Sequence, residues 1–175
     1  ATQSVPGTCV TVALEGRRAL ATEVQALVTP STLASPRRTT SGVDSSRLAM
    51  VLAVLASRAG APFGNRDVYV STVGGARLHE PAVDLALALA AVSDLEGVAL
   101  ARGMVAIGEV GLSGELRRVA GIGPRLAEAG RLGFTRAVVP TMSVDAGQVP
   151  AGMSLVEVPH LAAAVAAARE VSTSA

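Results

Sequence analysis

The sequence contains no lysine: all 15 of its Lys and Arg residues are arginine, alongside 14 Asp and Glu residues, and the formal net charge is +1. A Ser-Lys dyad, a Schiff-base lysine and the phosphate-binding lysine of a Walker A loop are therefore excluded within this chain. Tryptophan is absent too, and the aromatic residues are limited to Phe63, Tyr69 and Phe134. This scarcity argues against a platform on which single-stranded bases stack.

Nitrogen and sulfur metal ligands are equally scarce, because the chain has one cysteine, Cys9, and two histidines, His79 and His160. A structural zinc site needs four such ligands, so we expect no metal site and no cofactor in this chain. Cys9 lies in an alternating apolar run, which favours a buried strand residue over the nucleophile of a Cys-His pair.

Long hydrophobic runs are missing as well. Every apolar stretch is interrupted by Arg, Glu, Asp or Gly well before the ~20 residues that a membrane span requires. The N-terminus shows no basic segment followed by an apolar one, so no secretory signal is visible. We expect a cytoplasmic protein without a membrane partner.

The length and composition predict one globular domain. The chain has 175 residues, of which 50% are hydrophobic, and chains of this size bury a substantial core without a disulfide or metal. We expect a single domain over 1–175, with a core at 8–140 and a C-terminal strand-helix unit at 141–171. An initial hairpin followed by helices and strands predicts an α/β (α+β) class: a mixed sheet with an N-terminal β-hairpin and covering helices.

Local patterns place the individual elements. β-branched residues on both sides of Glu15-Gly16-Arg17 indicate a hairpin, and apolar residues at i, i+3, i+4 and i+7 from Leu48 indicate a helix. Proline is favoured in a first helical turn, so a central, nearly all-apolar helix is expected to open at Glu80-Pro81. The expected strands are 8–14, 19–28, 67–73, 104–110, 115–119, 137–139 and 155–158, and the other expected helices are 45–58, 122–132 and 159–170, followed by a frayed tail at 171–175.

The segment 29–42 is polar, contains two prolines and has no hydrophobic period, so we expect a long surface loop. Arg37 and Arg38 lie in this loop, and Arg47 lies at the start of the following helix. Arginine on an exposed loop suits bidentate contact with phosphate. A solvated face explains the same residues equally well.

A glycine pair at the start of an expected helix, Gly121-Ile122-Gly123, has two interpretations. Helix N-termini attract anions, which would suit a phosphate site. Pro124 removes one donor and the third glycine of a nucleotide-binding motif is missing, so a simple strand-to-helix turn is favoured.

Two carboxylates at i and i+4, Glu80 and Asp84, also have two interpretations. Such a pair could carry out acid-base chemistry. Acids at a helix start also complement the helix dipole and hold a nearby arginine, and we expect an ion pair of Glu80 or Asp84 with Arg77 or Arg125. Glu109 and Glu115 flank a glycine-rich turn at 111–114 and are expected to fix that turn or to lie at a subunit contact, and Glu109 is also an expected member of the same structural network.

Several segments in a fixed order carry a family resemblance. The segments 22–28, 36–48, 74–86 and 108–115 closely resemble the C-terminal domain of the RadA (Sms) family of bacterial DNA repair proteins. The last of them reads Gly108-Glu109-Val110-Gly111-Leu112-Ser113-Gly114-Glu115, and the similarity continues through 131–140. The resemblance covers nearly the whole chain and implies a Lon-protease-like domain.

Members of the wider Lon-like superfamily use a serine nucleophile and a lysine base. Setting their motifs on this chain places the nucleophile at Ala82 and the base at Arg125. Alanine has no hydroxyl and arginine stays protonated, so the resemblance implies a degenerate dyad and no peptidase activity.

The same resemblance implies a role in homologous recombination. RadA-type proteins carry an upstream zinc finger and a RecA-like ATPase, which are absent here, so ATP, Mg and Zn are expected only in those domains. The family acts as homo-hexameric, DNA-dependent motors in branch migration. The implied partners are single-stranded or branched DNA and a recombinase of the RecA type. We expect this domain to scaffold the ring and, through Arg37, Arg38 and Arg47, to contact DNA; a pure oligomerisation scaffold and a residual peptidase are the alternatives.

Overall fold

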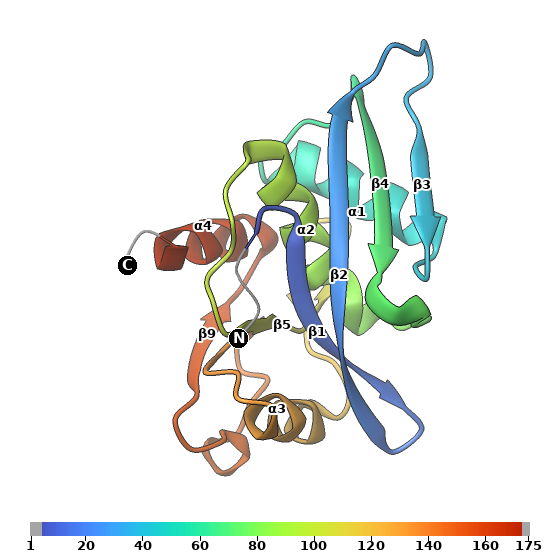
Figure 1. The fold of residues 1–175 in the computed structure, drawn as a ribbon. Helices are drawn as coiled ribbons and strands as arrows, with labels where there is room; N and C mark the ends of the chain where they lie inside the picture. Colours follow the sequence, from blue (N-terminus) through green and yellow to red (C-terminus); the bar gives the residue numbers. More distant parts are fainter. Residues whose placement is uncertain (1–4, 173–175) are drawn as a thin grey trace.

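The computed structural model describes residues 5–172 and has the expected α/β architecture, a mixed sheet with helices on its faces (Figure 1). The strands of the main sheet are β1 (Thr8–Glu15), β2 (Arg18–Pro30), β3 (Arg38–Ser41), β4 (Arg66–Thr72), β5 (Met104–Ala106), β8 (Arg136–Pro140) and β9 (Ser154–Val158), and β6 (Glu109–Val110) pairs with β7 (Leu116–Arg117). The helices are α1 (Ser45–Arg58), α2 (Asp84–Glu96), α3 (Ile122–Arg131) and α4 (Leu161–Ser172), with 3-10 turns η1 (Val73–Gly75), η2 (Pro81–Val83) and η3 (Ala146–Gln148).

The main sheet has the strand order β3-β4-β2-β1-β5-β8-β9. β1 and β2 form the predicted antiparallel hairpin, and β2 is also antiparallel to β4. The remaining neighbours, β3 with β4 and the series β1, β5, β8 and β9, run parallel. The sheet is therefore mixed, as the order of elements predicted.

Alternating side chains build one core on each face of the sheet. Met104 and Ala106 of β5 pack with α1, α2 and α4, whereas Val105 between them packs with Ile122 and Leu126 of α3. Three helices thus cover one face and α3 covers the other. Figure 1 shows α1 and α2 behind β2 and β4, with α3 at the lower end of the view.

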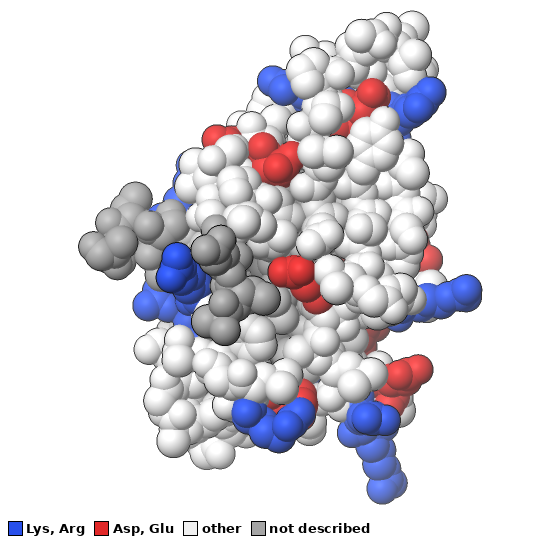
Figure 2. Space-filling view, in the orientation of Figure 1, with Lys and Arg blue, Asp and Glu red and all other residues white. Residues whose placement is uncertain are grey.

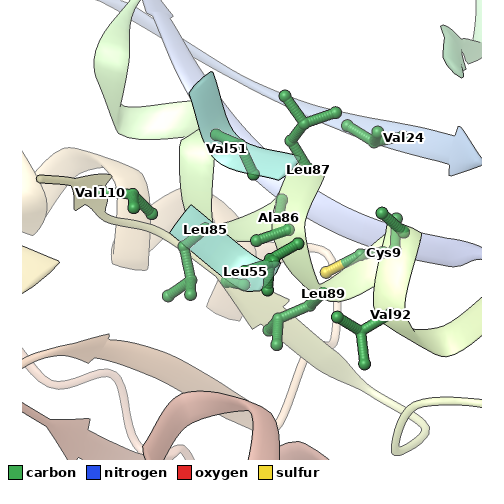
Figure 3. Packing of buried hydrophobic residues seen from close by; sticks show 14 of the residues in the cluster. Cys9, Val24, Val51, Leu55, Leu85, Ala86, Leu87, Leu89, Val92 and Val110 are labelled. Carbon is green, nitrogen blue, oxygen red and sulfur yellow. The ribbon is translucent and has the colours of Figure 1, made fainter. Parts of the chain in front are cut away.

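Helix α2 is the centre of the larger core, as its apolar sequence predicted. Its residues from Asp84 to Ser93 are all buried, and Figure 3 shows Leu85, Leu87 and Leu89 among side chains of α1 and the sheet. The helix ends at Gly97, whose φ of +67° is a left-handed conformation that glycine adopts at little cost.

Several parts of the structure differ from the sequence-based expectation. The helix expected to open at Glu80-Pro81 begins with the 3-10 turn η2, and α2 itself starts at Asp84. The expected loop 29–42 contains strand β3, a short edge strand whose polar residues carry no hydrophobic signal. The expected strand 104–110 is broken into β5 and β6 at Ile107-Gly108, where the Gly108 N–H turns to the Ala82 carbonyl at 2.9 Å. Of the expected frayed tail, residues 171–172 belong to α4 and 173–175 lie outside the described residues.

Candidate functional site

One edge of strand β1 loses its strand partner beside the start of α2. β1 pairs with β5 at Val10, and farther along β1 the backbone groups that face the same way have no strand partner. A buried polar backbone group needs another partner. The Val12 carbonyl accepts a hydrogen bond from Arg125 Nη1 at 3.0 Å, and the Leu14 N–H donates to Glu80 Oε1 at 3.1 Å. Side chains from α3 and from the segment before η2 therefore close this edge.

Glu80 and Arg125 also bind each other. Arg125 Nη2 donates to Glu80 Oε2 at 3.1 Å, and Nη1 forms a second, shorter bond with Oε1. Arg125 Nε donates to the Ala120 carbonyl at 3.1 Å, so all three guanidinium nitrogens are engaged. The Arg125 side chain is 3% exposed and that of Glu80 is 26% exposed. The expected ion pair between these residues is confirmed.

Ala82, the position that the resemblance assigns to a nucleophile, lies two residues beyond Glu80. Its side chain is buried among apolar residues of the α3 face, including Val12, Ile122 and Leu126. Its carbonyl accepts the Gly108 N–H. The side chain of Ala82 is therefore surrounded by apolar side chains, and the Glu80–Arg125 ion pair covers the neighbouring edge of β1.

Asp84 forms a second ion pair, with a partner that differs from the expected Arg77 or Arg125. The fully buried carboxylate accepts Arg47 Nε at 2.6 Å and Arg47 Nη2 at 2.7 Å. It also accepts the Val110 N–H at 3.1 Å. The bond to Asp84 raises the pKa of Arg47. This pair joins α1, α2 and β6, which gives Arg47 a structural role that its position in the sequence did not suggest.

Of the other two residues of the expected network, Arg77 lies outside these pairs, whereas Glu109 lies near enough to Arg47 to contribute to its raised pKa. Arg77 is exposed and, within residues 5–172, makes no ion pair. Glu109 is partly buried and lies 3.9 Å from Arg117 Nη1. The four expected members, Arg77, Glu80, Asp84 and Glu109, therefore do not meet in one cluster.

The candidate DNA contacts in the β2–β3 region differ in availability. Arg38 donates to the Phe63 carbonyl at 2.9 Å and to the Arg66 carbonyl, which ties its guanidinium to the backbone before β4. Arg37 has an exposed side chain, while its backbone N–H donates to Asp67 Oδ1 at 2.6 Å. That bond, with a smaller contribution from Ser31, lowers the pKa of Asp67.

Of the three arginines proposed to contact DNA, Arg37 presents an exposed guanidinium. Arg38 and Arg47 hold structural partners inside this chain.

A groove of about 850 Å³ was not predicted from the sequence. It lies between the end of the β1–β2 hairpin and the segment 75–80. Its lining includes Leu14, Leu20, Arg77, His79 and Glu80. It could not be found from the sequence, because its walls come from separate elements that carry no shared motif.

The glycine pair before α3 supports the turn interpretation. Gly121 has φ +70°, and a Cβ on it would lie 2.5 Å from Leu14 Cδ1. Close approach of the chain to the hairpin explains this glycine without a ligand. Among residues 5–172, no group of three or more His, Cys, Asp or Glu side chains could hold a metal ion, and no helix is long and apolar enough to cross a membrane.

Two comparisons with known proteins give matches over most of the chain. The family model described as subunit ChlI of Mg-chelatase matches residues 40–143, more than half of the chain. The DNA repair protein RadA of Mycolicibacterium smegmatis is 51% identical over 169 residues, which are 97% of this chain and 35% of that protein. RadA of Synechocystis sp. is 47% identical over 162 residues, covering 93% of this chain and 32% of that protein, and RadA of Bacillus subtilis is 38% identical over 159 residues, covering 91% and 35%.

The chain spans about a third of the length of these curated relatives. The RadA matches cover nearly all of it, in agreement with the motifs from Thr22 to Pro140. On these matches, the chain belongs to the family of subunit ChlI of Mg-chelatase, and it is similar over nearly its whole length to about a third of the length of the RadA proteins.

Proposed function

We propose that this chain is a non-catalytic, Lon-like domain of a RadA-type DNA repair protein, where it supports assembly of a ring and contacts DNA. The relatives named DNA repair protein RadA support the repair role. Peptidase activity is not part of the proposal. The 175 residues would form one such domain, with the strand-helix unit at 141–171 completing it.

The observation that carries the non-catalytic part is the state of the two dyad positions. A serine nucleophile needs a base that can accept its proton. Ala82 offers a buried methyl group, and Arg125 is a permanently charged group held by Glu80 and two backbone carbonyls. A substitution that restored serine at 82 would bury its hydroxyl in an apolar cluster, so the packing also supports a structural role.

DNA contact is the functional part of the proposal. The formal charge of +1 provides no strong overall attraction for DNA, so contact must come from local arginine groups. Of the arginines proposed from the sequence, Arg37 has an exposed guanidinium, whereas Arg38 and Arg47 would need to give up partners to reach a phosphate. Arg37 is the member of this set that supports direct contact best.

The remaining properties would belong to a whole protein of the length of the RadA relatives, of which this chain spans about a third. We propose that this protein is a DNA-dependent ATPase with an upstream zinc finger and a RecA-like motor, forms a homo-hexamer, and drives branch migration together with a RecA-type recombinase. The cofactors ATP, Mg and Zn would then serve those upstream domains.

The test measures the mass of the chain in solution with and without DNA. A ring whose mass increases when DNA is added supports the proposal. A ring whose mass does not change when DNA is added at low salt supports a pure oligomerisation scaffold instead. Cleavage of an unfolded protein substrate that disappears on replacing one serine would establish the peptidase alternative and overturn the non-catalytic assignment.

A further inference from the structure

The end of the β1–β2 hairpin projects from the sheet as a two-stranded ribbon. β2 pairs with β4 from Val24 to Pro30, whereas its first residues, Arg18 to Glu23, pair with β1 alone among the strands. The strands turn at Gly16, whose φ is +63°. Figure 1 shows this hairpin end extending below the rest of the sheet, next to α3.

Two exposed arginines, Arg17 and Arg18, occupy the turn. Within the described residues, neither side chain forms a hydrogen bond or an ion pair. Arg18 lies close enough to Glu128 of α3 to contribute to the lowered pKa of that carboxylate, after the larger effects of Arg131. Glu128 forms its ion pair with Arg131. The guanidinium groups of Arg17 and Arg18 are therefore available to a ligand.

Two further exposed arginines have side chains without a partner among the described residues and belong to segments that reach the hairpin. Arg118 is exposed and precedes Gly121, which packs against Leu14 of the hairpin. Arg77 lines the groove beside the end of the hairpin. Of the acidic groups there, Glu80 is bound to Arg125, whereas Glu15 lies directly across the strand pair from Arg18 and lowers the net positive charge of the hairpin end.

The opposite end of β2 is a poorer anion site. Arg37 and Arg38 lie beside the carboxylate of Asp67, and Arg38 is engaged by backbone carbonyls. The two ends of β2 are about 40 Å apart at ~3.3 Å per residue of strand. Figure 2 shows arginine side chains with neighbouring acidic groups at both the lower and the upper end of the molecule, and a largely uncharged face between them.

We propose that the end of the β1–β2 hairpin enters a groove of duplex DNA, with Arg17 and Arg18 at its tip and Arg77 and Arg118 on its flanks contacting phosphates. This inference rests on the DNA contact proposed above and relocates it. The major groove of B-DNA admits a two-stranded β-ribbon. Duplex suits the ribbon better than single-stranded DNA, because Phe63, Tyr69 and Phe134 all lie outside the ribbon, which leaves it no ring on which bases could stack.

The test is fluorescence anisotropy with a labelled 20-base-pair duplex and a single strand of the same length, over a series of salt concentrations. Each phosphate contact contributes about 0.9 to the slope of log affinity against log salt. We expect R17A/R18A to weaken duplex binding at least about tenfold and to reduce the slope by about 1.8. R17K/R18K should keep most of the affinity and the slope, because it keeps the charges.

The matched control is R58A/R102A, which removes two exposed arginines that also have no partner within the described residues. We expect it to bind within twofold of the wild type, and all variants to keep the wild-type melting temperature. If R17A/R18A binds like the control while R37A loses affinity, DNA contact stands and its location on the hairpin is wrong. If R17A/R18A reduces single-strand binding alone, the duplex assignment is wrong. If the wild-type chain binds neither DNA, the DNA contact of the proposed function fails and the hairpin inference fails with it.

Discussion

Replacing Glu80 with glutamine tests whether the sealed strand edge stabilises the fold. Glu80→Gln removes the charge opposite Arg125, whose side chain is 3% exposed and has no room to move into water. Breaking a buried ion pair by removing one partner costs about 3–5 kcal/mol, because an uncompensated charge stays buried. For a chain of this size each kcal/mol lowers the melting temperature by about 2–4 °C. We therefore expect a decrease on the order of 10 °C.

Two other variants separate charge from geometry at the same site. Arg125→Lys keeps the charge, but a single ammonium cannot serve Glu80, Val12 and Ala120 together as the guanidinium does. We expect an intermediate loss of about 1–3 kcal/mol, the cost of leaving buried acceptors unsatisfied. The E80Q/R125M double variant should be less unstable than the sum of its single variants, because the two residues are coupled.

The assay is urea unfolding followed by circular dichroism, with thermal unfolding as a second measure. Arg131→Met is the matched control, since Arg131 forms an exposed ion pair with Glu128 and exposed pairs contribute little. Its unfolding midpoint should stay near that of the wild type. A Glu80→Gln variant as stable as this control would refute the reasoning that the pair holds the edge of β1 closed.

Three further predictions concern single side chains. Burial, with a smaller effect of Glu23, raises the pKa of the Cys9 thiol to about 12. This thiol should therefore react with Ellman's reagent at pH 8 far more slowly in the folded protein than in the unfolded protein. Fast labelling of the folded protein would contradict this prediction. The pKa of Asp67 is lowered in the fold, so its carboxylate stabilises the protein above its unfolded pKa of about 3.9, and this stabilisation is lost as the pH falls through the folded pKa. Asp67→Asn should therefore lose less stability than the wild type between about pH 5 and pH 2. An equal loss would contradict the prediction. Thr11 Oγ1 is buried without a hydrogen-bond partner among the described residues, so Thr11→Val should raise the free energy of unfolding by about 1 kcal/mol, and a destabilised variant would show that the hydroxyl is satisfied.

Elements with strong periodic signals could be predicted from the sequence. Helix 45–58 was predicted with the bounds that the structure shows, and the hairpin around Gly16 was predicted within a few residues. Apolar spacing and turn chemistry are local signals. Strand β3 has neither, because its stability comes from pairing with β4 and from Asp67 and Phe63, which are distant in sequence.

The candidate site was predictable only where local sequence signals or a family motif pointed to its residues. The Glu80–Arg125 pair followed from the carboxylate at a helix start and the family motif, and it is present. The Asp84–Arg47 pair was missed, because it depends on how α1 crosses α2 rather than on local spacing. The sequence analysis therefore proposed Arg47 as a DNA contact because it lies in a basic segment. In the structure its guanidinium is paired with Asp84 inside the fold.

The central claim is that this RadA-type chain contacts DNA through local arginine groups. Its most direct test is the affinity of the wild-type chain for duplex DNA measured as a function of salt concentration. We expect binding at low salt whose affinity falls linearly on a log-log plot against salt concentration, with a slope equivalent to about two or more phosphate contacts. Absence of binding at low salt, or binding that does not change with salt, would contradict it.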